Sequence, residues 1–204
     1  MNKTFSIIAL LAIGAVAGPV MAQQSPWLVR ARVVNIDTAN KFDTSSALAT
    51  DSVDVSNKTI PEVDISYFFT PNLAAELILT YPQKHDVSLN GIDIGTLKHL
   101  PPTLLLQYHF MPEAQFSPYV GAGLNYTRVS QVDLLEGAAT LEKNSYGLAL
   151  QAGVDFKLDK NWSLNLDVKK VQIRSDLSLT GNGTKLGTVK IDPWLVGVGV
   201  GYRF

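Results

Sequence analysis

Apolar and polar side chains alternate along most of the chain after residue 22. The last stretch, PWLVGVGVGYRF at 193–204, has large apolar groups on one face, which begins and ends in aromatic rings, and mostly glycine on the other. A repeat of two residues indicates a β-strand. Eight segments follow this repeat, at 27–36, 60–69, 72–81, 99–110, 116–127, 145–156, 162–170 and 193–204. The pattern predicts an all-β fold.

The links between these segments alternate in length. They are short after the second, fourth and sixth segments (TPN, MPEAQ and KLDKN) and long and polar after the others, as at 37–58 and 131–144. Tight turns at one end and long loops at the other are typical of transmembrane β-barrels. We therefore predict an eight-stranded antiparallel transmembrane β-barrel with short periplasmic turns and long extracellular loops, and with both termini in the periplasm.

The two faces of each segment have different roles in such a barrel. The bulky face meets lipid, with aromatic residues near the interfaces, and the glycine-rich face points into a narrow interior. Closure pairs the backbone groups without water, which is why a barrel crosses a bilayer when an open sheet cannot. The alternative is a soluble lipocalin-like barrel, which also has eight strands but would place its large apolar side chains inside.

The N-terminus has the features of an export signal. Lys3 supplies positive charge, FSIIALLAIGAVAG is the apolar stretch, and VMA ends at Ala22 as a small-residue cleavage site. We assign residues 1–22 to a cleaved signal peptide and residues 23–204 to the barrel; an uncleaved membrane anchor is the alternative. No later segment approaches the run of about 18 apolar residues that a membrane helix needs.

Composition narrows the function classes. The chain has no cysteine, so an exported protein of this kind is stabilised without disulfides. After removal of residues 1–22, whose only charge is Lys3, 16 basic and 18 acidic residues remain, and no block of lysine and arginine suggests a nucleic-acid partner. His85, His99 and His109 lack metal-binding spacing, and we expect neither a metal nor another cofactor.

Four stretches of the chain resemble the OmpW family of bacterial outer-membrane proteins: WLVRARVVNI, KHLPPTLLLQYHF, SPYVGAGLNYT and DPWLVGVGVGYRF. The similarity covers essentially the whole of 23–204, and the second stretch is the most specific. The resemblance implies a bacterial outer-membrane barrel with a narrow, partly apolar interior that passes small hydrophobic molecules. It also implies that Tyr202 and Phe204 form the insertion signal read by the barrel assembly machinery.

Prolines interrupt the fourth segment. Pro101 and Pro102 follow Leu100, and each lacks the N–H that a strand donates to its neighbour. Because successive residues aim their N–H groups at opposite neighbours, this strand should pair poorly on both sides there. Pro61 weakens the second segment at a similar level. One interpretation is a side opening through which an apolar solute leaves into lipid; the other is ordinary strand termination.

The inward face also contains the candidates for a solute passage. Its apolar members would contact a hydrophobic solute, or would simply pack the interior: Leu28, Val34, Phe68, Ile78, Leu105 and Leu195. Its charged members would form a structural ion-pair network, or a selectivity lining: Arg30, Arg32, Glu62, Asp64, Glu76, Asp155, Lys157, Asp167, Lys169 and Arg203.

We expect passive transport rather than catalysis. HDVS brings His85, Asp86 and Ser88 into one loop, but a catalytic triad is recognised by geometry and no oxyanion signature accompanies it. The leading hypothesis is uptake of small hydrophobic compounds, with membrane lipid and these solutes as partners. The alternatives are a channel for small polar solutes or ions, and a structural or receptor barrel whose long loops bind other molecules.

Overall fold

The computed structural model describes residues 25–39, 41–44, 53–89, 91–134, 137–181 and 183–204, so the predicted signal peptide lies outside the described residues. Eight strands form the body of the fold, in the spatial order β11-β12-β15-β1-β4-β5-β8-β9, and β9 pairs with β11 to close the ring. All neighbours are antiparallel, as predicted. The strands are β1 (Trp27–Asp37), β4 (Lys58–Phe68), β5 (Leu73–Leu79), β8 (Thr103–His109), β9 (Phe116–Leu134), β11 (Asn144–Lys157), β12 (Trp162–Val171) and β15 (Trp194–Arg203).

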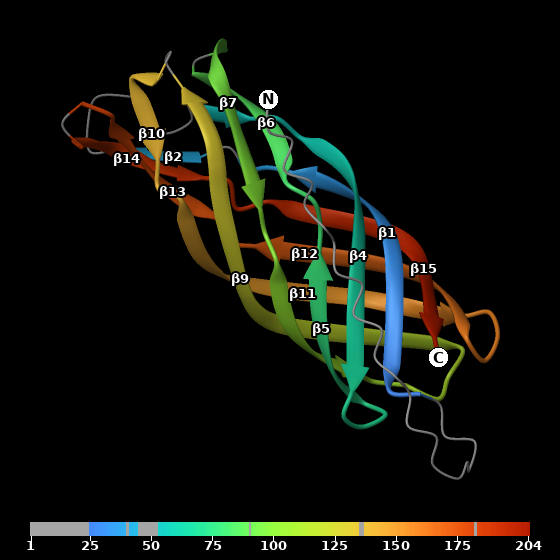
Figure 1. Cartoon of the computed structure of the whole chain (residues 1–204). Coiled ribbons are helices and arrows are strands. Elements are labelled where there is room, and N and C mark those ends of the chain that lie inside the picture. The colour runs from blue at the N-terminus through green and yellow to red at the C-terminus, as the bar shows by residue number, and fades with distance from the viewer. Residues whose placement is uncertain (1–24, 40, 45–52, 90, 135–136, 182) are drawn as a thin grey trace, which may run out of the picture.

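Both described ends of the chain lie at the end of the barrel that holds the short turns, which we call the turn end. The backbone N–H of Ser25 donates to the carbonyl of Phe204 at 2.9 Å, and that of Arg203 donates to the carbonyl of Asn161 in the turn before β12 at 2.8 Å. Figure 1 shows the C-terminus at this end. The topology predicted from the alternating link lengths is therefore confirmed.

The long links contain strands that the sequence pattern did not predict. They are β2 (Lys41–Thr44), β3 (Val53–Val55), β6 (Gln83–Leu89), β7 (Ile92–Leu100), β10 (Ala139–Leu141), β13 (Arg174–Leu179) and β14 (Lys185–Lys190). They pair with one another and with β9, and continue the wall beyond the barrel (Figure 1). We call this part the extension. Its strands replace the extended polar loops expected from the sequence because backbone groups clear of the membrane still gain from ladder pairing.

The outward face of the barrel is apolar with aromatic residues at both ends. Aliphatic residues such as Val198, Leu106 and Leu124 are more than half exposed. At the turn end, Trp162 and Phe204 each pack edge-on against Tyr202. At the other end, the ring centroids of Tyr126 and Tyr146 lie 5.1 Å apart. An exposed apolar band between two aromatic girdles is the outer surface of a membrane barrel.

The inward face is packed, and two glycines allow neighbouring strands to approach closely. A Cβ at Gly123 would lie 1.9 Å from the carbonyl oxygen of Leu104, and a Cβ at Gly199 would lie 2.1 Å from that of Ala31. Any larger residue would push the adjacent strand outward at these points. The described residues contain no helix long and apolar enough to cross a membrane.

Candidate functional site: an apolar pocket above a buried ion-pair cluster

Arg30 crosses the barrel interior and binds carboxylates on three other strands. Its Nη2 lies 2.7 Å from Oδ2 of Asp155, and its Nη1 lies 3.2 Å from Oε1 of Glu76 and 3.3 Å from Oδ1 of Asp64. The same Nη1 donates to Ser66 Oγ at 3.1 Å. The inward position of each residue follows from the two-residue repeat, and the barrel brings these distant segments together.

Arg32 and Lys169 continue this network toward the extension. Arg32 Nη1 lies 3.0 Å from Oε1 of Glu62, and its Nη2 lies 2.9 Å from Oε1 of Glu76. Lys169 Nζ lies 2.6 Å from the same Glu62 oxygen and 2.9 Å from Oδ1 of Asp167. We call the set the ion-pair cluster; it contains Arg30, Arg32, Glu62, Asp64, Glu76, Asp155, Asp167 and Lys169.

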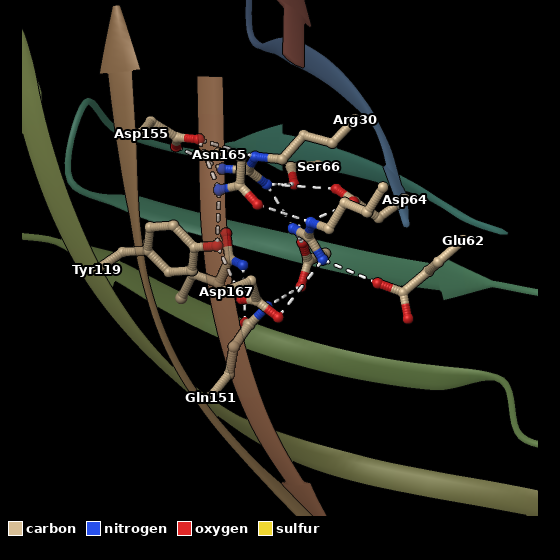
Figure 2. Close-up of polar contacts among 12 residues, drawn as sticks. Arg30, Glu62, Asp64, Ser66, Tyr119, Gln151, Asp155, Asn165 and Asp167 are labelled. Carbon is tan, nitrogen blue, oxygen red and sulfur yellow. Dashed lines mark hydrogen bonds and ion pairs between the residues drawn. The ribbon is translucent and has the colours of Figure 1, made fainter. Parts of the chain in front are cut away.

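Neutral polar groups add further hydrogen bonds to this cluster (Figure 2). Tyr119 Oη donates to Oδ2 of Asp167 at 2.9 Å. Gln151 Nε2 donates to Asp167 and to Glu76, both at 2.8 Å. Asn165 accepts from Arg32 Nε at 2.8 Å and donates to Oδ1 of Asp155 at 2.9 Å. Because its charges are paired and its side chains are buried, the cluster fills the middle of the barrel rather than lining an open channel.

An apolar pocket lies on the extension side of the cluster. Glu62 and Lys169 belong to its lining, with Thr103 and Asn125 as further polar members. The rest is mostly aliphatic: Ile36, Ile60, Ile78, Val171, Ile173, Pro193 and Leu195, with Thr80, His99 and Pro101 completing the set. Apolar walls with a few polar groups at one side are what a binding site for a mostly hydrophobic molecule needs.

The barrel wall beside this pocket has an unpaired stretch. β4 pairs with β5 only from Phe68 to Val63, and its residues 58–62 pair with β1 alone among the described strands. The chain leaves β5 after Leu79, and β6 begins at Gln83 and pairs with β3 and β7. Within the described part of the chain, the edge of β4 around Pro61 therefore has no ladder partner on the β5–β6 side.

The prolines of the fourth segment lie at the same level. The segment predicted as a single strand at 99–110 is divided, because β7 ends at Leu100 and β8 begins at Thr103. On the side that faces β5, Thr103 pairs with Ile78. The next pair on that side toward the extension is His99 with Gln83, so the ladder is interrupted between them. The expectation of poor pairing on both sides was wrong for β9: its Tyr126 N–H donates to the Pro102 carbonyl at 3.1 Å, since proline lacks a donor but keeps its acceptor.

The six apolar residues predicted from the inward face are all buried, but they fall into separate groups. Ile78 and Leu195 line the apolar pocket. Leu28 and Phe68 line a second pocket at the turn end, together with Arg203 and Lys157. Val34 and Leu105 belong to the same buried apolar core as Ile78 and Leu195. The ion-pair cluster lies between the two pockets, so these residues do not form one continuous passage.

Four β-branched aliphatic residues of the pocket wall were not among those predicted from the sequence to line the passage. Ile36 and Ile60 continue the inward repeat of β1 and β4 by one more step, and Val171 does the same for β12. Ile173 follows two residues later, beyond the end of that strand. Extending each inward repeat to its last apolar residue would have found the first three.

Two predicted cations lie outside the ion-pair cluster. Lys157 Nζ donates to the carbonyl of Pro112 in a short turn. Arg203 lies over the ring of Phe68, 4.1 Å from its centroid, and its Nε donates to the carbonyl of Ser25 at 3.0 Å. Both therefore belong to the turn end.

The residues of HDVS do not form a triad. His85 is buried on the inward face of β6, and its ring stacks on that of His99 with the centroids 4.7 Å apart. Asp86 is exposed on the opposite face of the strand. Within the described part of the chain, no group of three histidine or carboxylate side chains is placed to hold a metal ion.

The predicted insertion signal lies at the turn end. Phe204 is 60% exposed, and its ring packs 5.0 Å from that of Tyr202. Its N–H donates to the carbonyl of Trp27 at 3.2 Å, so the end of the chain is held against the first strand.

Comparison with known proteins agrees with this architecture. The family model described as the OmpW family matches residues 23–204. The "Uncharacterized outer-membrane protein y4mB" of Sinorhizobium fredii is 42% identical over 190 residues, covering 91% of this chain and 82% of that protein. "Outer membrane protein W" of Vibrio cholerae is 32% identical over 222 residues and the whole of both chains. A more distant relative from Pseudomonas aeruginosa, 25% identical over 92% of this chain and 93% of that protein, is named "Dibenzothiophene metabolism operon protein PahQ".

A solved structure has the same fold. The outer membrane protein OprG of Pseudomonas aeruginosa superposes with a TM-score of 0.77 at 27% identity, covering 91% of this chain and 99% of that chain. With a closed eight-stranded barrel, two aromatic girdles and a family match over nearly its whole length, the chain belongs to the OmpW family and is a β-barrel protein of the bacterial outer membrane.

Proposed function

We propose that the protein passes small hydrophobic molecules across the outer membrane, and that they leave the apolar pocket sideways into the bilayer. The observation that carries this proposal is the position of the unpaired β4 edge, which lies next to an apolar pocket closed below by the ion-pair cluster. A solute that enters from the extracellular end meets Glu62 and Lys169 on its way down and aliphatic groups at its sides.

The chemistry of the two routes supports a sideways exit. A hydrophobic solute that moved along the barrel axis would have to displace paired, buried charges, which is costly because each would lose its partners. Leaving past Ile60, Thr80 and Pro101 keeps it among groups of the pocket wall and delivers it to lipid. A relative whose name refers to dibenzothiophene, an apolar aromatic compound, fits the same class of solute.

Replacement of the two prolines tests the exit. Pro101→Thr with Pro102→Val restores two N–H groups in residues suited to a strand, so that β8 can extend its pairing toward residues 79–82. A gained ladder bond stabilises by about 0.5–1.5 kcal/mol. We expect slower uptake of a labelled hydrocarbon into vesicles that contain the variant, with unchanged ion conductance. Pro71→Thr, in a short turn, is the matched control.

Filling the pocket gives an independent test. Ile60→Trp places a large ring in the apolar pocket, whereas Ile65→Trp changes the outward face of the same strand. The first variant should slow hydrocarbon uptake and the second should not. If both proline and pocket variants fold and take up hydrocarbon at the wild-type rate, lateral exit is wrong. If a small polar solute enters as fast as the hydrocarbon, the protein is a channel for polar solutes.

A further inference from the structure

Four solvent-accessible cations gather on one side of the extension, just beyond the aromatic girdle. Lys84 on β6 and Lys98 on β7 are direct cross-strand partners, and Lys98 is opposite Ser130 on β9. Arg128 lies two residues before Ser130 and is opposite Asn144, which follows Lys143 in the chain. Lys84, Lys98 and Arg128 thus lie on three neighbouring strands, and Lys143 lies in the bend just before a fourth, β11. We call these four residues the basic patch.

The height of the patch follows from its strands. Arg128 is two residues beyond Tyr126 on the outward face of β9, a step of about 7 Å along a strand. Tyr126 pairs with Tyr146, and these rings mark the extracellular interface of the membrane. The basic patch therefore lies at the level of the lipid headgroups of the outer leaflet.

Among the described residues these four charges have no ion-pair partner. None of the four forms an ion pair with a described carboxylate, whereas Arg174 and Lys185, elsewhere in the extension, pair with Asp192 and Asp176. Like charges placed directly opposite each other, as Lys84 and Lys98 are, destabilise a sheet. The exposed carboxylates of these three strands are Asp86 and Asp133, both opposite Thr96, and Asp93 near the start of β7, and all three lie further from the girdle. Glu142, exposed in the bend before β11, directly precedes Lys143 but forms no ion pair with it. An anion from outside the protein would offset the repulsion.

We propose that the basic patch binds the phosphorylated glucosamine headgroup of lipid A in the outer leaflet. Lipid A is the membrane component that carries phosphates at this depth on the extracellular side. Arginine and lysine bind phosphate through charge-assisted hydrogen bonds, which are stronger than neutral ones. Its acyl chains would then lie along the exposed aliphatic face of β8 and β9, against Leu104 and Leu124. This proposal is independent of the transport function.

The test compares two four-fold variants of the full-length protein in detergent micelles. The first is Lys84→Gln, Lys98→Gln, Arg128→Gln and Lys143→Gln. The control removes as many cations from β12, β13 and β14: Lys170→Gln, Arg174→Gln, Lys185→Gln and Lys190→Gln. The probes are bisphosphorylated lipid A and the same lipid with its phosphates removed. Binding is followed by native mass spectrometry, and folding by the heat-dependent shift in electrophoretic mobility.

We expect the wild type and the control variant to prefer bisphosphorylated over dephosphorylated lipid A, and the patch variant to lose at least about ten-fold of that affinity. An equal loss in both variants, or no loss in the patch variant, would overturn the proposal. So would complete displacement of the lipid by millimolar inorganic phosphate, which would indicate a site for small anions. If the patch variant does not fold, Lys98→Gln and Arg128→Gln are tested singly, and unchanged affinity in both would be decisive against it.

Discussion

Arg30 and Asp155 are 125 residues apart in sequence, yet their side chains meet inside the barrel with Nη2 and Oδ2 2.7 Å apart. The contact links β1 to β11, which are not neighbours in the ring. Arg30 is fully buried and also contacts Asp64 and Glu76. Together with Arg32, which pairs with Glu62, Asp64 and Glu76, it neutralises several buried carboxylates.

Replacement of Arg30 by methionine should strongly destabilise the barrel. Loss of one partner of a buried ion pair leaves uncompensated charge, at a cost of about 3–5 kcal/mol. Arg174→Met is the control, since its pair with Asp192 is half exposed and should contribute only about 0–1 kcal/mol. Urea unfolding of both variants in lipid vesicles measures the difference, and equal free energies of unfolding would show that the ion-pair cluster is not structural.

A lysine on the lipid face should be poorly tolerated. Val198 is 61% exposed in the middle of β15, opposite Val33 and Leu166 on its two neighbours. Val198→Lys should cost about 2–4 kcal/mol if this position lies near the bilayer midplane. Ile92→Lys, at a 70% exposed position in the extension, should cost almost nothing. The free energies of unfolding in vesicles distinguish the two, and equal tolerance would contradict the assignment of this face to lipid.

Deletion of Phe204 should impair assembly. Its ring packs on Tyr202 at the turn end. The resemblance to outer-membrane barrels predicts that this pair is the signal read by the assembly machinery. We expect less protein in the outer membrane and more aggregate in the periplasm, measured by cell fractionation. Phe69→Ala, at an exposed aromatic of a short turn, should insert normally. Wild-type insertion of a chain that ends at Arg203 would exclude this role.

Acidification should loosen the extension before it affects the barrel. Burial, with added repulsion from His85 and Lys58, lowers the pKa of His99 to about 3. Burial also lowers the pKa of His85, although its bond to the Ser56 carbonyl opposes this. Because both groups bind protons more readily when unfolded, the stability of the extension should fall as the pH drops from about 6.5 toward 3. The nearby Asp86 carboxylate acts in the opposite direction and raises the pKa of His85.

Hydrogen exchange measures this effect strand by strand. Protection of β6 and β7 should fall between pH 7 and pH 4, while that of β11 and β12 should change less. His99→Phe with His85→Phe removes both titrating groups and should abolish the pH dependence in β6 and β7. If this double variant loses protection as steeply as the wild type, groups other than His85 and His99 cause the pH dependence.

The alternation of side chains determined the barrel. Eight segments with a two-residue repeat, joined by links of alternating length, are enough to place each residue on the lipid face or the inward face, because strand geometry alone sets that choice. This is why Arg30, Glu76, Leu105 and Leu195 were all placed inside correctly. The family was recognisable for a related reason, since its distinctive stretches are barrel strands.

Only the closed structure decided which inward residues meet. Ring order and register bring Arg32, Glu62 and Lys169 together from three strands, and no local signal in the chain specifies such contacts. The division of the interior by the ion-pair cluster, and the unpaired edge of β4 beside the apolar pocket, are likewise properties of strand pairing. Local periodicity specifies the direction of a side chain, whereas its partners depend on how the whole sheet closes.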